Sequence, residues 1–184
     1  MVNQYLSEND AVGLVALVTS VKPKVVIEIG CNVGRTAKMI LDAVPSIERY
    51  VGIDVPQDHR PTLRCQYSEV PSNPGHYAAG DERFFLLVKE GGSQALGPQD
   101  LEPCDAVFID GDHSEQAVTL DAYLARKLVR PGGIIVFHDY NNPAVEVTRA
   151  IDKLKSQGWK MQQVSHTWLA FMRIGGSDAA PEAR

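Results

Sequence analysis

Short apolar runs recur along this chain, and each is followed by glycine, proline or charged residues. Runs of about four to eight apolar residues between such breakers are typical of buried β-strands. Two later apolar segments, at 159–165 and 168–174, are predicted to form a closing antiparallel pair. The other predicted strands lie at residues 25–28, 50–53, 84–88, 106–109 and 133–137.

Segments with helical spacing of apolar positions separate these strands. An N-terminal helix is expected within residues 1–23, opening at Ser7 with acidic residues in its first turn. Strands that alternate with helices predict an α/β fold, with a mostly parallel sheet covered by helices on both faces. The other predicted helices span about 35–44, 114–129 and 143–157.

The interval 56–81 breaks this alternation. It is rich in proline, glycine and polar residues and has weak helical periodicity, where a doubly wound fold normally has a crossover helix. We predict a long loop with one short helical turn, and loops of this length are often functional. The whole segment 1–174 is expected to be one domain, and the small, polar stretch 175–184 is expected to be a disordered tail.

Composition narrows the function. The net charge of −5 disfavours a sequence-independent grip on nucleic acid, which needs a basic surface. No apolar run approaches the ~18 residues of a membrane span, and the N-terminus lacks the pattern of a signal peptide. Three widely spaced cysteines form no metal knuckle and are typical of reduced thiols, so a cytoplasmic protein is expected.

The stretch after the first predicted strand carries the most information. Glu28 ends that strand, and Gly30, Asn32 and Gly34 follow in a tight turn before the next helix. Glycine lets the backbone curl and approach a ligand closely because it has no Cβ. The pyrophosphate-binding signatures Gly-x-Gly-x-x-Gly and Gly-x-x-x-x-Gly-Lys-Ser/Thr are both absent, which argues against NAD and ATP.

This acid-x-Gly-x-x-x-Gly pattern resembles motif I of class I S-adenosylmethionine (SAM) dependent methyltransferases. Three further strings, at 108–113, 130–133 and 137–140, resemble the small-molecule O-methyltransferase branch with its catechol-type and macrolide-sugar enzymes. The resemblance spans roughly residues 24–174. It implies a doubly wound, Rossmann-like sheet of seven strands, mostly parallel with an antiparallel last strand.

The distinctive residues fall at strand ends, where open parallel sheets bind their ligands. Under the resemblance, the backbone of Gly30, Asn32 and Gly34 would hold the methionine part of SAM, and Glu28 would accept from a backbone or amino-group donor. Asp54 would accept from both ribose hydroxyls. The family usually has an acid after strand three, near the adenine. This chain has Gly-Gly-Ser at 91–93, and Ser93 is the candidate contact to the adenine edge.

Two carboxylates, Asp110 and Asp139, end neighbouring predicted strands. In metal-dependent O-methyltransferases, matching positions bind a divalent cation, so Asp110 and Asp139, with His138, are candidate ligands for Mg²⁺ or Mn²⁺. Imidazole suits Mn²⁺ better than Mg²⁺. His113 has the spacing of the general base in the macrolide-sugar relatives, and Asp110 would act beside it. The alternatives are that the carboxylates bind the acceptor without metal, and that His113 only caps a loop.

We therefore expect a SAM-dependent methyltransferase, with metal-assisted O-methylation of a small hydroxylated acceptor. A metal-independent methyltransferase and a non-catalytic SAM-binding protein are the alternatives. Nucleic-acid and membrane partners are not expected, and a homo-oligomer stays open. Tyr140 has two interpretations, a wall of the acceptor pocket or ordinary core packing.

Overall fold

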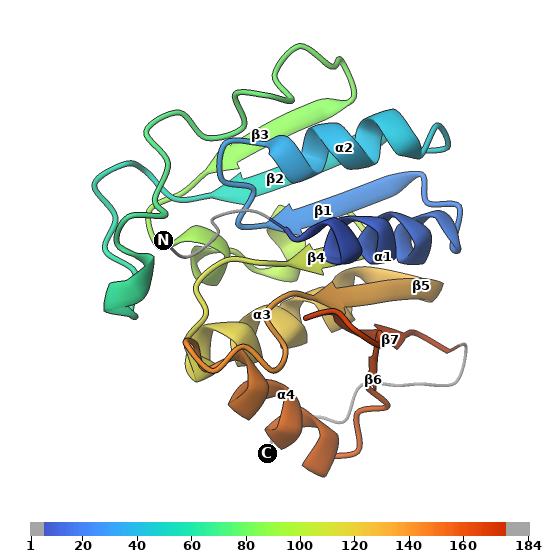
Figure 1. Ribbon diagram of the computed structural model, residues 1–184. Coiled ribbons are helices and arrows are strands. Elements are labelled where there is room, and N and C mark those ends of the chain that lie inside the picture. The colour runs from blue at the N-terminus through green and yellow to red at the C-terminus, as the bar shows by residue number, and fades with distance from the viewer. Residues whose placement is uncertain (1–5, 176–184) are drawn as a thin grey trace.

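In the computed structural model, which describes residues 6–175, one seven-stranded sheet runs through the molecule (Figure 1). Its order is β3-β2-β1-β4-β5-β7-β6, and β7 runs antiparallel to both of its neighbours. The predicted doubly wound, Rossmann-like sheet with an antiparallel last strand is confirmed. The strands are β1 (Val25–Ile29), β2 (Arg49–Asp54), β3 (Phe84–Val88), β4 (Cys104–Ile109), β5 (Val129–Phe137), β6 (Gln162–Gln163) and β7 (Ala170–Arg173).

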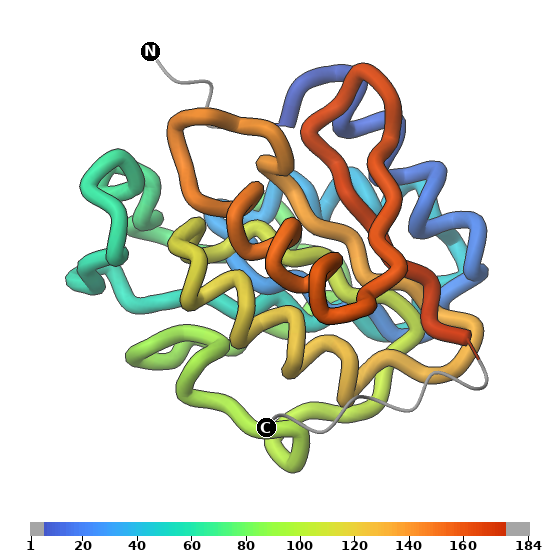
Figure 2. The backbone as a smooth tube through the Cα atoms, turned by 90° about the horizontal axis from the view of Figure 1, so that it is seen from below, coloured from blue at the N-terminus to red at the C-terminus, as the bar shows by residue number. Residues whose placement is uncertain are grey.

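Four α-helices cover the sheet, α1 and α2 on one face and α3 and α4 on the other (Figures 1 and 2). Serine caps two of them: the Ser7 side chain accepts from the Asp10 N–H at 3.1 Å, and the Ser114 side chain accepts from the Ala117 N–H. The bounds are α1 (Glu8–Thr19), α2 (Arg35–Ala43), α3 (Glu115–Leu128) and α4 (Val147–Ser156), with 3-10 turns η1 (Arg64–Gln66), η2 (Gly92–Ala95) and η3 (Pro98–Asp100).

The central strands are buried on both faces, which is why they read as continuous apolar runs instead of alternating patterns. Along β1, Ile27 and Ile29 pack towards α3 and α4, whereas Val26 packs towards α1 and α2. Two core clusters, one on each face, hold the sheet rigidly. Within residues 6–175, no helix has the length and apolar character that a membrane crossing needs.

Helix α4 begins at Val147, later than the predicted start at 143. Side-chain hydrogen bonds hold the preceding residues in turns, because the Asn142 amide oxygen accepts from the Ala144 N–H at 3.0 Å and Thr148 Oγ1 accepts from the Asn141 N–H at 2.8 Å. Such local bonds compete with helix formation. The predicted strand 159–165 is also reduced, to the two residues of β6. The predicted disordered tail, apart from Gly175, lies outside the described residues.

The segment 56–81 contains no α-helix and one 3-10 turn, η1. It folds back onto the start of α2, where the Gly75 N–H donates to the Asn32 carbonyl at 2.8 Å. Because no crossover helix covers the edge strand β3, its apolar side chains stay partly in solvent, with Phe85 42% exposed. The loop therefore packs against the turn that follows β1 at the carboxyl end of the sheet. It does not cover the edge strand β3.

Gly34 tests this loop packing. It has φ +83°, and a Cβ there would lie 2.9 Å from the Gly75 carbonyl. Gly34→Ala should lower the free energy of unfolding by at least about 2 kcal/mol, from backbone strain plus the clash. Gly132→Ala is the matched control, because Gly132 has φ +89° and a Cβ there would meet no other atom within 4 Å, so it should lose only about 1 kcal/mol. Equal losses in urea denaturation would contradict the packing argument.

Candidate functional site

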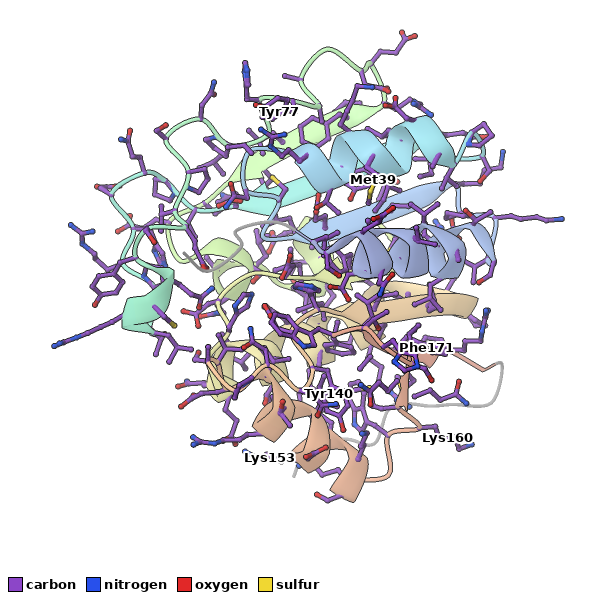
Figure 3. All side chains as sticks on the ribbon, viewed as in Figure 1. Met39, Tyr77, Tyr140, Lys153, Lys160 and Phe171 are labelled. Atoms are coloured by element: carbon purple, nitrogen blue, oxygen red, sulfur yellow. The ribbon has the colours of Figure 1, made fainter. Side chains whose placement is uncertain are left out.

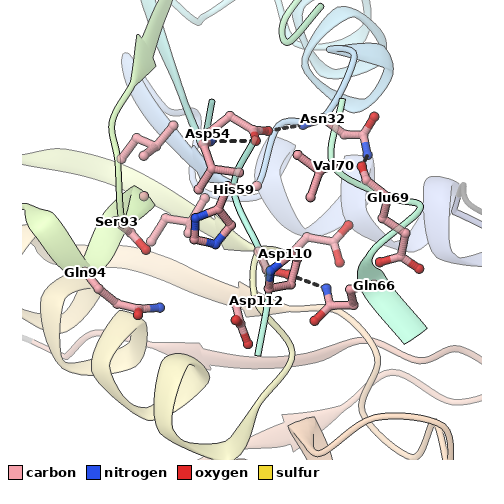
Figure 4. Close-up of a pocket in the computed structure, with 18 of the residues that line it drawn as sticks. Asn32, Asp54, His59, Gln66, Glu69, Val70, Ser93, Gln94, Asp110 and Asp112 are labelled. Atoms are coloured by element: carbon pink, nitrogen blue, oxygen red, sulfur yellow. Dashed lines mark hydrogen bonds between the residues drawn. The ribbon is translucent and has the colours of Figure 1, made fainter. Parts of the chain in front are cut away.

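The carboxyl ends of the parallel strands bring Asp54, Asp110 and Asp139 to one end of the sheet. Two clefts open there and share four lining residues: Gly30, Asn32, Glu69 and Asp110. The first cleft extends from this boundary towards Asp54, His59, Ser93 and Gln94 (Figure 4). The second cleft extends towards Asp10, Arg35, His113, His138, Asp139 and Trp168.

Asp54 is the fixed acid of the first cleft. Its carboxylate accepts from the N–H groups of Asn32 at 2.6 Å and Val55 at 2.7 Å, so its orientation is set by backbone. Burial raises the pKa of Asp54, although these two backbone hydrogen bonds oppose the rise. The carboxylate oxygens keep lone pairs for further donors from a ligand.

The turn after β1 needs glycine for its packing. Gly30 has φ +84°, and a Cβ there would lie 2.3 Å from the Asp110 carbonyl oxygen. Asn32 also has a positive φ of 47°, and its side-chain amide donates to the Glu69 carbonyl at 2.8 Å. The loop 56–81 is thereby tied to the turn. Gly34 lines neither cleft and lies against Gly75.

Glu28 lies inside β1 and lines neither cleft. Its carboxyl group accepts from the Tyr50 hydroxyl at 3.0 Å in the core between β1 and β2. Burial raises the pKa of Glu28 well above its usual range. The predicted contact of Glu28 with a cofactor therefore stays a prediction, and the partner seen in the structure is Tyr50.

In the second cleft, two histidines bridge carboxylates from different elements. His113 Nε2 lies 3.3 Å from Asp110 Oδ1, and His113 Nδ1 lies 3.4 Å from Asp139 Oδ2. His138 Nδ1 lies 3.2 Å from the same Asp110 oxygen and 3.4 Å from the same Asp139 oxygen. His138 Nε2 faces Asp10 Oδ2 at 3.6 Å. We call these five residues the histidine–carboxylate network.

The charges of this network are strongly coupled. Burial alone would raise the pKa of Asp110, but the positive charge of His138 and hydrogen bonds from both histidines lower it to about 2. Burial would lower the pKa of His138, but Asp110, Asp10 and Asp139 raise it to about 12. Asp110, Asp139 and Glu69 raise the pKa of His113 against the effect of burial. The site thus holds an imidazolium at neutral pH.

Three members of the network have the composition of a metal site. Three ligand atoms, one each from Asp110, His113 and Asp139, all lie within 4.8 Å of one another. The predicted set had His138 in place of His113. His138 lies beside both aspartates but also turns its second nitrogen towards Asp10.

Sequence reasoning missed three residues that line or support the site. Asp10, expected only as a first-turn acid, accepts from the Trp168 N–H at 2.8 Å and faces His138. Gln66 joins Gly111 to the His113 backbone, donating to the Gly111 carbonyl at 2.9 Å and accepting from the His113 N–H at 2.8 Å. Glu69 belongs to both clefts. No local pattern distinguishes Gln66 or Glu69 from other polar loop residues.

Two labelled tyrosines, Tyr77 and Tyr140, lie in different parts of the molecule (Figure 3). Tyr77, beside the start of α2, accepts from the Arg35 guanidinium at 2.8 Å and stacks with it, and Arg35 lines the cleft. Tyr140 is buried and donates to Asp152 at 3.1 Å, while Lys155 donates to its hydroxyl. It lines neither cleft, so the core-packing interpretation of Tyr140 is the one that the structure supports.

A family model described as a methyltransferase domain matches residues 27–140 of the chain. The matched segment contains the turn after β1, Asp54, Asp110 and the residues that follow β5, which include His138 and Asp139. A search of the curated proteins finds no match.

Many solved structures share the fold. A methyltransferase from Podospora anserina with bound SAH is 14% identical, with a TM-score of 0.66 over 93% of this chain and 80% of that one. The O-methyltransferase TomG from Streptomyces achromogenes, in complex with SAM, is 16% identical, with a TM-score of 0.62 over 95% and 84%. The calicheamicin methyltransferase CalS11 is 18% identical, with a TM-score of 0.68 over 90% and 78%.

Asp10 tests the network. Its lowered pKa, about 2, means that it stabilises the fold above the unfolded value near 3.8 and that this contribution is lost as the pH falls towards 2. Asp10→Asn should lose about 2 kcal/mol of unfolding free energy at pH 7, because a hydrogen-bonded charge is removed. The variant should also have a weaker acid dependence below pH 4, measured by urea denaturation across pH. An unchanged acid limb would show that Asp10 is not coupled to His138.

Proposed function

Because the chain belongs to the methyltransferase domain family, we propose that it transfers a methyl group from SAM to a hydroxyl group of a small acceptor. One observation carries this proposal: the two clefts meet at Asp110, with His113 on the side of the second cleft. A donor in one cleft and an acceptor in the other would then face each other across that boundary. Such juxtaposition supplies much of the rate of a bimolecular transfer.

The first cleft has donors and acceptors for the parts of SAM. Asp54, held by two backbone N–H groups, would accept from the ribose hydroxyls. The turn at 30–32 would present backbone to the methionine part, and Ser93 would meet the adenine edge. SAM supplies an electrophilic methyl group on a sulfonium. The residues of the first cleft would orient that group towards the boundary at Asp110.

On the acceptor side, His113 would remove the hydroxyl proton. Its two nitrogens face Asp110 and Asp139, and these carboxylates stabilise the imidazolium that forms. They also raise the pKa of His113, so the neutral, basic form is favoured only towards higher pH. Trp168, 42% exposed at the wall of the second cleft, offers a flat surface to an apolar part of the acceptor.

A divalent cation fits the same place. Asp110, His113 and Asp139 provide two carboxylate oxygens and one imidazole nitrogen in a compact group, a mixed set that suits Mn²⁺ better than Mg²⁺. When bound, such an ion lowers the pKa of a coordinated hydroxyl group. These three residues would hold it, and His113 would then be a ligand instead of the base. Asn142, which donates to Asp139 at 2.6 Å, would fix the orientation of one ligand.

A metal-independent methyltransferase is the second candidate. The imidazolium of His138 already lies between Asp110 and Asp139 and supplies a positive charge where the ion would be. His113 would then act as the base without help from a metal. The third alternative, a SAM-binding protein without catalysis, does not account for the three carboxylates and two histidines gathered in the second cleft.

The cysteines, the second cleft and the net charge bear on where the protein works and on its partners. Cys31 and Cys104 are buried and Cys65 is exposed, all as free thiols, which supports a reducing, cytoplasmic location. The second cleft has a volume of about 780 Å³, which is in the range of small-molecule sites and supports a small-molecule acceptor. The net charge of −5 disfavours nucleic acid as a partner, and a homo-oligomer stays open.

Asp54 tests the cofactor site. Asp54→Asn should weaken SAM binding by about 10- to 100-fold, because a charged acceptor for the ribose hydroxyls is lost. Isothermal titration calorimetry with SAM measures this effect. Asp58→Asn is the matched control, because Asp58 is exposed in the next loop and lines neither cleft. Failure of the unaltered protein to bind SAM would refute the proposed function.

Calorimetric titration with Mn²⁺ separates the metal-assisted candidate from the metal-independent one. After chelator treatment, the protein should bind Mn²⁺, and Asp139→Asn or His113→Gln should weaken binding by at least about tenfold, since even outer partners of metal ligands have effects of that size. His138→Gln should bind Mn²⁺ as well or better, because a competing positive charge is removed. Absence of any Mn²⁺ heat, with SAM binding intact, would favour the metal-independent enzyme.

A further inference from the structure

A buried serine–aspartate pair lies behind the first cleft. The Ser93 hydroxyl donates to Asp121 Oδ1 at 2.6 Å, joining the 3-10 turn η2 to α3. Ser93 is 6% exposed and lines the cleft, whereas Asp121 is 1% exposed and does not line it. Asp121 therefore reaches the cleft only through Ser93.

The carboxyl group of Asp121 is poorly satisfied as a structural element. Its second oxygen, Oδ2, is buried without a hydrogen-bond partner among the described residues. Burial raises the pKa of Asp121 to about 7, the Ser93 hydrogen bond opposes the rise and the charge of Asp112 adds to it. A half-satisfied buried carboxylate destabilises a fold, and an apolar residue of similar size would pack there at lower cost. Stability alone gives no reason for an acid at this position.

The hydrogen bond fixes what Ser93 can offer to a ligand. A serine hydroxyl has one proton and two lone pairs. When Asp121 is ionised it takes this proton, so the serine oxygen can present only lone pairs to the cleft. A ligand group that meets Ser93 must then be a hydrogen-bond donor, such as an amino group, because a carbonyl oxygen there would face another acceptor.

We propose that Asp121 is a positioning residue that holds the Ser93 hydroxyl as a hydrogen-bond acceptor. The first cleft then selects a purine with an exocyclic amino group facing Ser93 over a purine with a carbonyl group at the same ring position. The inference rests on the proposed function, because it takes the first cleft to hold the nucleoside of SAM. It assigns to Asp121 a role in specificity that is exerted without contact to the ligand.

Two stable nucleosides test this selection by calorimetry: S-adenosylhomocysteine and S-inosylhomocysteine, which differ in having an amino or a carbonyl group at purine position 6. The unaltered protein should prefer the adenosine compound by at least about tenfold, the usual penalty for an unpaired or repelled buried polar group. In Asp121→Leu, the Ser93 hydroxyl is free to rotate and donate, so the preference should fall to less than about threefold. Thr119→Val, on the same helix but outside both clefts, should keep the full preference.

Ser93→Ala is the second variant, and it should lose the preference because the acceptor itself is removed. If the role of Asp121 is purely structural, Asp121→Leu should weaken the binding of both compounds equally and leave the ratio of their affinities unchanged. That result would overturn the inference. Equal binding of the two compounds by the unaltered protein would overturn it as well. If that protein bound neither compound, the proposed function would fail, and this inference with it.

Discussion

The imidazole ring of His138 is shared among carboxylates from three separate elements: Asp10 on α1, Asp110 after β4 and Asp139 after β5. Each acid alone would be expensive to bury, and together they would repel one another. The imidazolium, whose pKa they raise to about 12, is what allows them to lie at one end of the sheet. The position of the N-terminal helix, the ends of two strands and the floor of the second cleft all depend on this charge balance.

The fold and much of the site could be predicted because both follow from local pattern. Buried strands appear as apolar runs, and the methyltransferase membership implied by the turn at 28–34 and the string at 108–113 is confirmed by the family match. Asp10 could not be placed, because its partner Trp168 is 158 positions away and a first-turn acid is ordinary at a helix start. The burial of Asp121 could not be predicted either, since a polar residue in a helix is expected to face solvent until its packing is known.

The loop 56–81 replaces a crossover helix with a set of contacts to the site. Gln66 holds the backbone of Gly111 and His113, and the Glu69 carbonyl holds the side chain of Asn32. The chain thereby supports the boundary between its two clefts with a segment that contains neither an α-helix nor a strand. The corresponding loss is at β3, where Phe85, Leu86 and Val88 are each about two-fifths exposed.

The glycine at position 30 is required by the main-chain carbonyl of residue 110, not by the aspartate side chain at that position. A descendant of this chain that lost the carboxylate at 110 would keep the same backbone, and would still need glycine at 30. Gly30 is therefore needed because the turn after β1 packs directly against the backbone of residues 110 and 111. It would persist in relatives that are no longer enzymes. Under the proposed function, such relatives would lose the acids and histidines at 110, 113, 138 and 139 together with their activity, but would keep the glycine.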